Sequence, residues 1–311
     1  MFRLLCVAIL LWTGSSPLSA AACQVTRQVA PGDSLANLAD FYYGDARFWP
    51  SLVLANNSRT GEGFRFISDV NDISRIPKLC VPDLAEAQRW RLRYERYMAA
   101  VADTALPEPW EVVPKLVEFP PDGPLQVATW IREDQLDSFR DSAGQWLKRA
   151  PNEIWVTAEP YLQKFCAAFT AAHGNDIEQL TLRLEQRLGL PPVSSKTTFL
   201  EIRLNLPAPD VIFRPCMSPA TNTTNCPLGP PPRDVEEAHK NWIYQQYYSS
   251  FGQSRLSSFP WTALGYTFDW APGPQDAGQF QRFGESEFVI RKGAPLEIVR
   301  AVGTVEYCKA N

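Results

Sequence analysis

The chain has 311 residues, of which 45% are hydrophobic and 21% charged, a composition typical of a folded globular protein and unlike a disordered or collagen-like chain. This length allows a small module joined to a larger domain. The net charge of −4, with no long run of either sign, disfavours a protein that binds nucleic acid through phosphate contacts.

The N-terminus has the three regions of a secretory signal peptide. Arg3 supplies the positive charge, residues 4–12 form an apolar run, and residues 14–22 are mostly small. The run is too short to span a bilayer, and no later segment is apolar over 18 residues. We therefore predict that residues 1–22 are a signal peptide, with an uncleaved anchor as the alternative, and that the protein is periplasmic or secreted.

Six cysteines remain after Cys6 of the signal peptide is set aside. An even number in an exported chain indicates disulfides. Cleavage after Ala22 would place Cys23 first, where a lipoprotein carries its lipid. The preceding Ala-Ala-Ala lacks the leucine usual in a lipid-attachment motif, so a lipid anchor at Cys23 stays open but disfavoured.

The segment after Cys23 has the pattern of a strand, two helices and a strand. Residues 25–29 alternate like a strand, and Asp33 or Ser34 can cap the helix that follows. A second helix runs from about Phe48 to Asn57, and residues 78–82 form a short strand closed by proline. We expect a β-α-α-β module over residues 23–82.

This stretch resembles the LysM domain over residues 24–82. The matching motifs are Val-x-Pro-Gly-Asp-Ser-Leu, Ala-x-x-Tyr-Tyr-Gly-Asp, Trp-Pro-x-Leu-x-x-Ala-Asn and Leu-x-Val-Pro, in that order. The family binds N-acetylglucosamine units of peptidoglycan or chitin in a shallow groove between two loops. The resemblance implies that the groove is formed by Gly32, Asp33, Ser34 and Leu35 of the first loop and by a second loop from Asn57 to Ile73.

The second loop departs from the family pattern. Residues 58–72 make it longer than usual, and Arg-Ile-Pro at 75–77 replaces the usual Pro-Gly-Gln. The alternative is a module kept as a spacer that no longer binds sugar. Because the first and last strands are antiparallel neighbours, Cys23 should lie beside Cys80, and a disulfide there should stabilise the module by about 4 kcal/mol.

A helical linker and a larger domain follow the module. Residues 83–104 have a helical period, and prolines 107 and 109 mark the end of a linker over 83–109. Residues 110–311 should form an α+β domain with a largely antiparallel sheet. The predicted strands are 125–131, 154–158, 198–206, 263–270, 287–291 and 296–308, and the predicted helices are 133–148, 159–173, 176–189 and 234–251.

The remaining four cysteines should brace the larger domain. Cys216 and Cys226 flank a loop of Ser, Thr, Asn and Pro and should pair locally, which leaves Cys166 and Cys308 as the third pair.

Only two histidines are present, His173 and His239, so a zinc enzyme with a histidine cluster is not expected. We predict no metal and no cofactor. Glu285 and Glu287 are the candidate catalytic residues, because side chains two apart on a strand share a face and can raise one another's pKa. The alternative is that both are solvent-exposed charges at a strand end with no catalytic role.

The Glu-x-Glu is also similar to the Arg/Ser/Glu order of ADP-ribosyltransferases. The arginine would be Arg203 or Arg214, and the serines are Ser257 and Ser258. An aromatic run from Trp242 to Trp270 is typical of a core and less often of a sugar platform.

The sequence therefore predicts an exported protein that binds peptidoglycan, or a related N-acetylglucosamine polymer, through its module. One alternative is a peptidoglycan-targeted enzyme, either a glycan hydrolase or an NAD-using ADP-ribosyl effector. Another is a structural component of an envelope assembly, with the helix 83–104 and the aromatic residues as partner surfaces.

Overall fold

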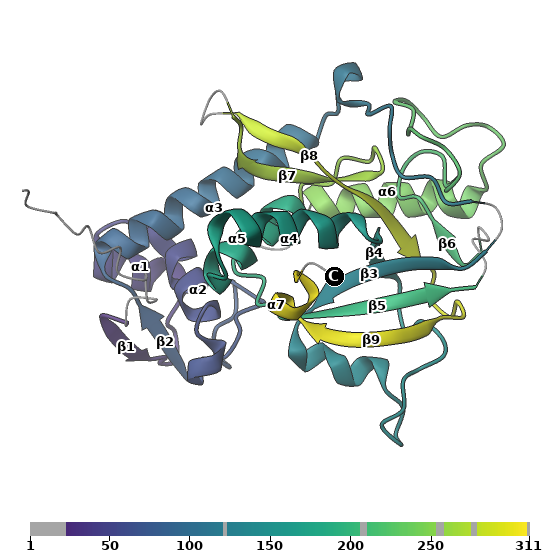
Figure 1. Cartoon of the computed structure of the whole chain (residues 1–311). Helices are drawn as coiled ribbons and strands as arrows, with labels where there is room; N and C mark the ends of the chain where they lie inside the picture. The colour runs from purple at the N-terminus through teal and green to yellow at the C-terminus, as the bar shows by residue number, and fades with distance from the viewer. Residues whose placement is uncertain (1–22, 121–122, 206–209, 253–257, 275–278, 310–311) are drawn as a thin grey trace, which may run out of the picture.

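The computed structural model describes residues 23–120, 123–205, 210–252, 258–274 and 279–309 (Figure 1). The predicted signal peptide and Ser257 lie outside the described residues. Helices and antiparallel sheets combine in an α+β protein, as the sequence predicts.

The N-terminal module has the predicted order of elements. Strand β1 (Val25–Gln28) pairs antiparallel with β2 (Lys78–Val81), and helices α1 (Leu35–Tyr43) and α2 (Trp49–Asn57) lie between them in the chain. Ser34 begins α1 by accepting a hydrogen bond from the Asn37 N–H, 3.2 Å away. The apolar faces of both helices close a small core against β2.

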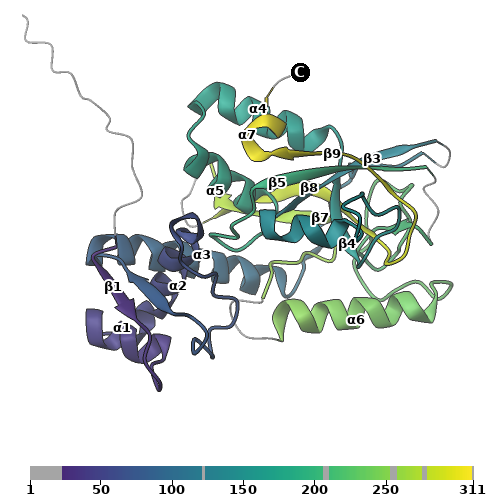
Figure 2. The same cartoon turned by 90° about the horizontal axis from the view of Figure 1, so that it is seen from below.

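Helix α3 (Leu84–Thr104) joins the module to the larger domain and packs against both (Figures 1 and 2). At its middle, the Tyr94 ring meets Trp49 of α2 edge-on. One turn later, Tyr97 is fully buried, packs against Trp270 and donates a hydrogen bond to the Ser258 carbonyl, 2.9 Å away. The linker is therefore a shared packing element.

The larger domain is built on one antiparallel sheet with the order β6-β8-β4-β3-β5-β9, and β7 pairs with the first half of β8. Its strands are β3 (Leu125–Ile131), β4 (Ile154–Ala158), β5 (Thr198–Leu204), β6 (Ile212–Phe213), β7 (Tyr266–Pro272), β8 (Phe280–Ile290) and β9 (Glu297–Gly303).

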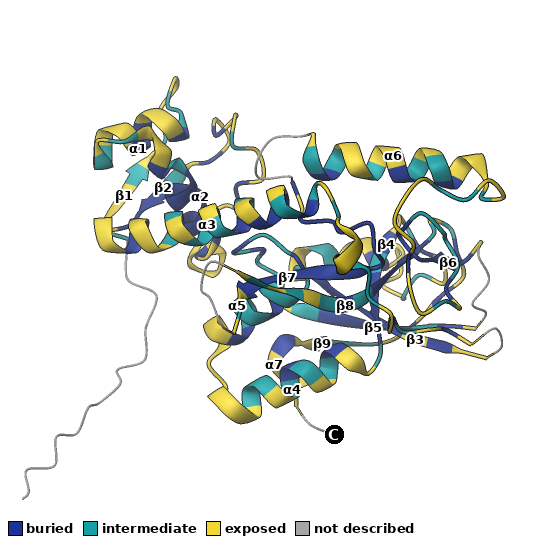
Figure 3. Cartoon of the chain, turned by 90° about the horizontal axis from the view of Figure 1, so that it is seen from above, coloured by how far each residue is buried: buried dark blue, intermediate teal, exposed yellow. Residues whose placement is uncertain are grey.

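Four helices lie on one face of this sheet: α4 (Tyr161–His173), α5 (Ile177–Arg187), α6 (Glu237–Phe251) and α7 (Thr304–Tyr307). Figure 3 shows buried strands and largely exposed outer turns of α4 and α6. The opposite face carries the main apolar core, with Val127, Val156 and Phe288 from the three central strands.

Three predicted elements differ clearly from the structure. The strand expected over 287–291 belongs to β8, which begins seven residues earlier, at Phe280. The helix expected over 133–148 is a 3₁₀ helix that ends at Phe139, because Asp141 accepts hydrogen bonds from Ala143 and Gln145 and Gly144 adopts a left-handed φ of 74°. The strand expected over 296–308 ends at Gly303, where the short helix α7 begins.

All three predicted disulfides are present: Cys23–Cys80, Cys166–Cys308 and Cys216–Cys226. They fit an exported protein, since such bonds persist in oxidising compartments. The Cys23 sulfur is bonded to Cys80 and therefore cannot carry a lipid. Within the described part of the chain, none of the helices could span a bilayer.

The Tyr97 contact gives a test of how the two parts of the chain are joined. We expect Tyr97→Ala to lower the free energy of unfolding by about 3–5 kcal/mol, because a fully buried ring and its hydrogen bond are lost together. Urea denaturation measures this, with Tyr248→Ala on the exposed face of α6 as control. A loss below about 1 kcal/mol would show that the contact is dispensable.

Candidate functional site

The first predicted groove loop lies on the surface of the module. Gly32 is exposed with a left-handed φ of 88°, which favours glycine. Asp33 accepts a hydrogen bond from the Ala30 N–H at 2.8 Å, and the Asp33 N–H donates to the Ala30 carbonyl at 3.0 Å. Together with the Ser34 cap, these bonds fix the loop, so its backbone is preorganised.

The other predicted groove residues point inward. Leu35 and Ile73 belong to the core of the module. Asn57 is also buried and holds the second loop by two hydrogen bonds, accepting from the Ile67 N–H at 2.7 Å and donating to the Ile67 carbonyl at 3.1 Å. The structure therefore leaves Gly32, Asp33 and Ser34 as the accessible predicted residues.

The second loop leads to a cavity of about 560 Å³ between the module and the larger domain. Its floor is the helix-covered face of the three central strands, with Trp130 on β3, Thr157 on β4 and Glu287 on β8. Its walls come from the module, from the segment after α5 and from the segment before β7. The wall residues include Leu54, Asn57, Phe66, Ile67, Leu188, Pro191, Ser194, Phe259 and Trp261.

Four polar side chains that line the cavity are almost completely buried, and each has an atom without a hydrogen-bond partner in the described part of the chain. These atoms are Oε1 of Glu287, Oγ1 of Thr157, Oγ of Ser194 and Nε1 of Trp261. Because buried polar groups are normally paired, this concentration in one cavity makes it a candidate binding site.

Burial raises the pKa of the Glu287 carboxyl to about 8, and the positive charge of Arg214 opposes the rise only in part. At neutral pH the group is therefore mostly a protonated acid, able to donate and to accept. On the far side of the floor, Lys196 donates to the Trp130 carbonyl at 2.7 Å, and burial lowers the pKa of its ammonium to about 8.

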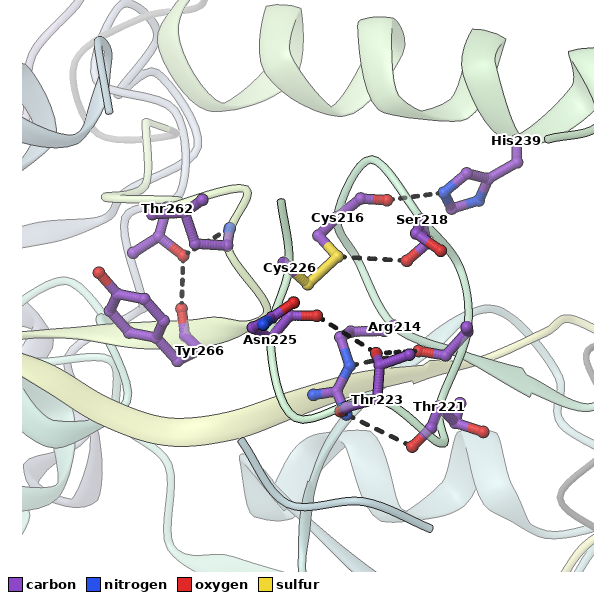
Figure 4. The surroundings of a disulfide bond; sticks show 12 residues. Arg214, Cys216, Ser218, Thr221, Thr223, Asn225, Cys226, His239, Thr262 and Tyr266 are labelled. Atoms are coloured by element: carbon purple, nitrogen blue, oxygen red, sulfur yellow. Dashed lines mark hydrogen bonds between the residues drawn. A yellow bond between two sulfur atoms is a disulfide. The ribbon is translucent and has the colours of Figure 1, made fainter. Parts of the chain in front are cut away.

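Arg214 is held outside the cavity by the loop that the Cys216–Cys226 disulfide closes (Figure 4). Its guanidinium donates to the carbonyls of Val117 at 2.7 Å and Thr223 at 3.0 Å, and it lies over the ring of Phe288, 4.6 Å from its centre. Its bonds to backbone carbonyls use Nε and Nη2, while Nη1 has no hydrogen-bond partner among the described residues. Arg214 acts on Glu287 by its charge and does not line the cavity.

Glu285 and Glu287 are both buried on β8, on either side of the partly exposed Ser286, as the predicted alternation requires. Tyr266 pairs with Ser286 and Phe268 with Phe283, so β8 contains one extra residue in this interval. Their surroundings differ: Glu285 accepts a hydrogen bond from Arg187 of α5 at 2.7 Å, whereas Glu287 lines the cavity. The raised pKa of Glu287 is therefore due to burial and not to a neighbouring carboxylate.

Of the other members of the ADP-ribosyltransferase pattern, Arg214 acts on Glu287 by its charge, whereas Arg203 and Ser258 lie elsewhere. Arg203 pairs with Glu297 at the sheet edge, and Ser258 lies under Tyr97. His239 is buried and hydrogen-bonded to the Cys216 carbonyl. Among the described residues, no group of three His, Cys, Asp or Glu side chains could hold a metal ion.

The predicted aromatic run divides between core and surface. Trp261, Tyr266, Phe268 and Trp270 are buried, whereas Tyr244, Tyr247 and Tyr248 on α6 are exposed. Trp261 is the member of the buried group whose N–H is unpartnered and whose side chain lines the cavity.

Sequence reasoning missed Thr157, Ser194 and Lys196, which come from distant segments. One local signal was present in the sequence. Gly284 interrupts a strand pattern, and a Cβ there would lie 2.2 Å from the Thr267 carbonyl oxygen, so the bulge requires glycine. Val193 adopts a left-handed φ of 60° in the cavity wall, an unfavourable conformation for a β-branched residue, but only the structure reveals it.

No known protein family, curated protein or solved structure matches this chain.

The two glutamates give opposite predictions for stability. The carboxyl of Glu287 has a pKa of 4.5 in the unfolded chain and about 8 in the folded protein. Between these two pH values, the folded protein keeps a proton on Glu287 that the unfolded chain releases. At pH 7 this disfavours folding by about 3 kcal/mol. Glu287→Gln should therefore stabilise the protein by about that amount at pH 7 and by almost nothing at pH 4.

The matched change Glu285→Gln should destabilise the protein at pH 7, by about 1–3 kcal/mol, because it breaks the ion pair with Arg187. Denaturation curves of both variants between pH 4 and pH 8 measure the two effects. A gain from Glu287→Gln that does not grow with pH would show that this carboxyl is not held protonated.

Proposed function

We propose that the protein is an exported glycan-binding protein that attaches to peptidoglycan, or a related N-acetylglucosamine polymer, through residues 23–82. The proposal is supported by the four motifs in order, by the β-α-α-β arrangement that the LysM resemblance implies and by three disulfides. The observation that carries it is the rigid, exposed loop of Gly32, Asp33 and Ser34.

The chemistry of this loop suits an acetamido sugar. Exposed backbone N–H and carbonyl groups around Gly32 can bond the amide of the sugar, and their fixed geometry limits the conformational entropy lost on binding. Leu35 and Ile73 lie in the core, so they would support the groove from beneath.

Binding can be tested with the full mature chain and insoluble peptidoglycan. Ser34→Glu should reduce sedimentation with the polymer at least tenfold, because it adds bulk and charge to the loop. Ser34→Ala is the matched control, since both changes remove the same helix cap and destabilise the protein by about 1 kcal/mol. We expect the alanine variant to lose much less binding than the glutamate variant, because it loosens the loop without placing bulk and charge in the groove.

Specificity can be tested in the same assay by competition. Soluble N-acetylglucosamine oligomers should displace the protein, whereas glucose oligomers of the same length should not, because they lack the acetamido group. Equal sedimentation of both Ser34 variants and the wild type would favour a module that serves only as a spacer.

The alternative of a two-carboxylate glycan hydrolase receives less support. Such chemistry needs a second carboxyl group that faces the bound sugar. Among the described residues that line the cavity, Glu287 is the only carboxylic acid, and Glu285 is engaged by Arg187.

We therefore expect that the full chain releases no soluble glycan fragment from purified peptidoglycan and no nicotinamide from NAD. Mass spectrometry of the reaction supernatants measures both. Turnover that disappears in Glu287→Gln would contradict this expectation and would make Glu287 a catalytic residue.

A further inference from the structure

The cavity between the module and the sheet has two polar ends separated by an apolar middle. One end lies at Glu287 and Thr157, which are paired neighbours on β8 and β4. Trp261 belongs to the same end. It forms an isolated β-bridge with Thr267, and two residues before Thr267 the Gly265 carbonyl accepts a hydrogen bond from the Glu287 N–H at 3.0 Å.

The chemistry of this first end suits an amide. A protonated carboxyl can donate to an amide carbonyl and accept from an amide N–H at the same time, and the Thr157 hydroxyl and the Trp261 N–H can each donate as well. All three groups have an atom without a hydrogen-bond partner in the described part of the chain. A ligand amide would satisfy them without requiring a buried charge on Glu287.

The second end is cationic. Lys196 uses one of its three N–H donors on the Trp130 carbonyl. The buried carboxyl of Glu185 acts on Lys196 by its charge but forms no direct ion pair with it. Arg132, which forms an ion pair with Asp134 at 2.9 Å, lies nearby over the ring of Phe66. Ser194 adds a buried hydroxyl two residues before Lys196. This end suits a carboxylate.

The sheet sets the distance between the ends. Glu287 and Trp130 are two strands apart and offset by two residues, which corresponds to about 12 Å between the backbones that carry the two groups. An acylated dipeptide spans about 7 Å from its acyl carbon to its carboxylate, and a hydrogen bond adds about 3 Å at each end. The walls between the ends are aromatic and aliphatic.

We propose that this cavity binds a short N-acylated peptide with a free carboxylate, its amide at Glu287 and Thr157 and its carboxylate at Lys196. Apolar side chains of the peptide occupy the middle of the cavity, against Trp155 and Phe259. An oligosaccharide fits less well, because its many hydroxyls would face apolar walls without partners. A fatty acid would fill the apolar middle but leave the Glu287 end unpaired. The site is separate from the Ser34 loop, so the proposal does not depend on glycan binding by the module.

The test uses the full mature chain and N-acetyl dipeptides that end in Ala, Leu or Phe. Binding is measured by calorimetry and by the fluorescence of the tryptophans in the cavity. We expect at least one of these peptides to bind saturably, and its C-terminal amide to bind at least tenfold more weakly because the contact with Lys196 is lost. Laurate and the N-acetylglucosamine dimer should bind more weakly than that peptide.

Substitutions at the two ends of the cavity test which residues contact the carboxylate of the peptide and which contact its amide. Lys196→Met should make the acid and the amide bind equally, whereas Lys309→Met, at an exposed lysine near the C-terminus, should leave the tenfold preference unchanged. Glu287→Leu should weaken binding of the acid and the amide alike, by tenfold or more. Thr157→Val tests the same end with a side chain of nearly the same shape, should the leucine variant fail to fold.

The proposal is overturned if none of the N-acetyl dipeptides binds, if laurate or the sugar dimer binds more tightly than all of them, or if the preference for the acid survives Lys196→Met. Loss of peptide binding with intact sedimentation on peptidoglycan would leave the proposed function of the module standing, so the two proposals can fail separately.

Discussion

The buried contact between helix α3 and strand β7 is the constraint on which the rest of the molecule depends. Tyr97 places a full aromatic ring against Trp270 and anchors its hydroxyl on the Ser258 carbonyl. Because the same helix packs on α2 a turn earlier, the module and the sheet are held at a fixed separation. The cavity exists because that separation leaves Phe66 and Ile67 facing the central strands.

Several residues that line the cavity make the folded protein less stable than apolar, unstrained residues would in their place. A carboxyl group at the centre of a sheet would normally be replaced by an apolar side chain or paired with a cation. Here the nearby cation, Arg214, is fixed by backbone carbonyls and leaves Glu287 Oε1 unpaired within the described part of the chain. A strained Val193 in the opposite wall adds to this cost. Such features persist at binding sites because ligand contacts offset them.

The two proposed sites have complementary chemistry. The exposed loop around Gly32 offers backbone groups to a polymer that remains largely in solvent, whereas the cavity encloses a small molecule and removes it from water. Cell-wall material that joins sugars to peptides would present both kinds of ligand. The short distance between the module and the cavity would then let one protein engage both parts, with α3 setting the spacing.

The sequence by itself determined the local features of this protein. The Ser34 cap, the β-α-α-β order and the pairing of Cys23 with Cys80 depend on residues close together in the chain or on two adjacent strands, and they are present as expected. Tertiary structure decided the site. Glu285 and Glu287 look equivalent in the sequence, but the packing of α5 sets Arg187 against the first and leaves the second in the cavity. Thr157, Ser194 and Lys196 join Glu287 only through long-range strand pairing and helix packing, which no local pattern of residues encodes.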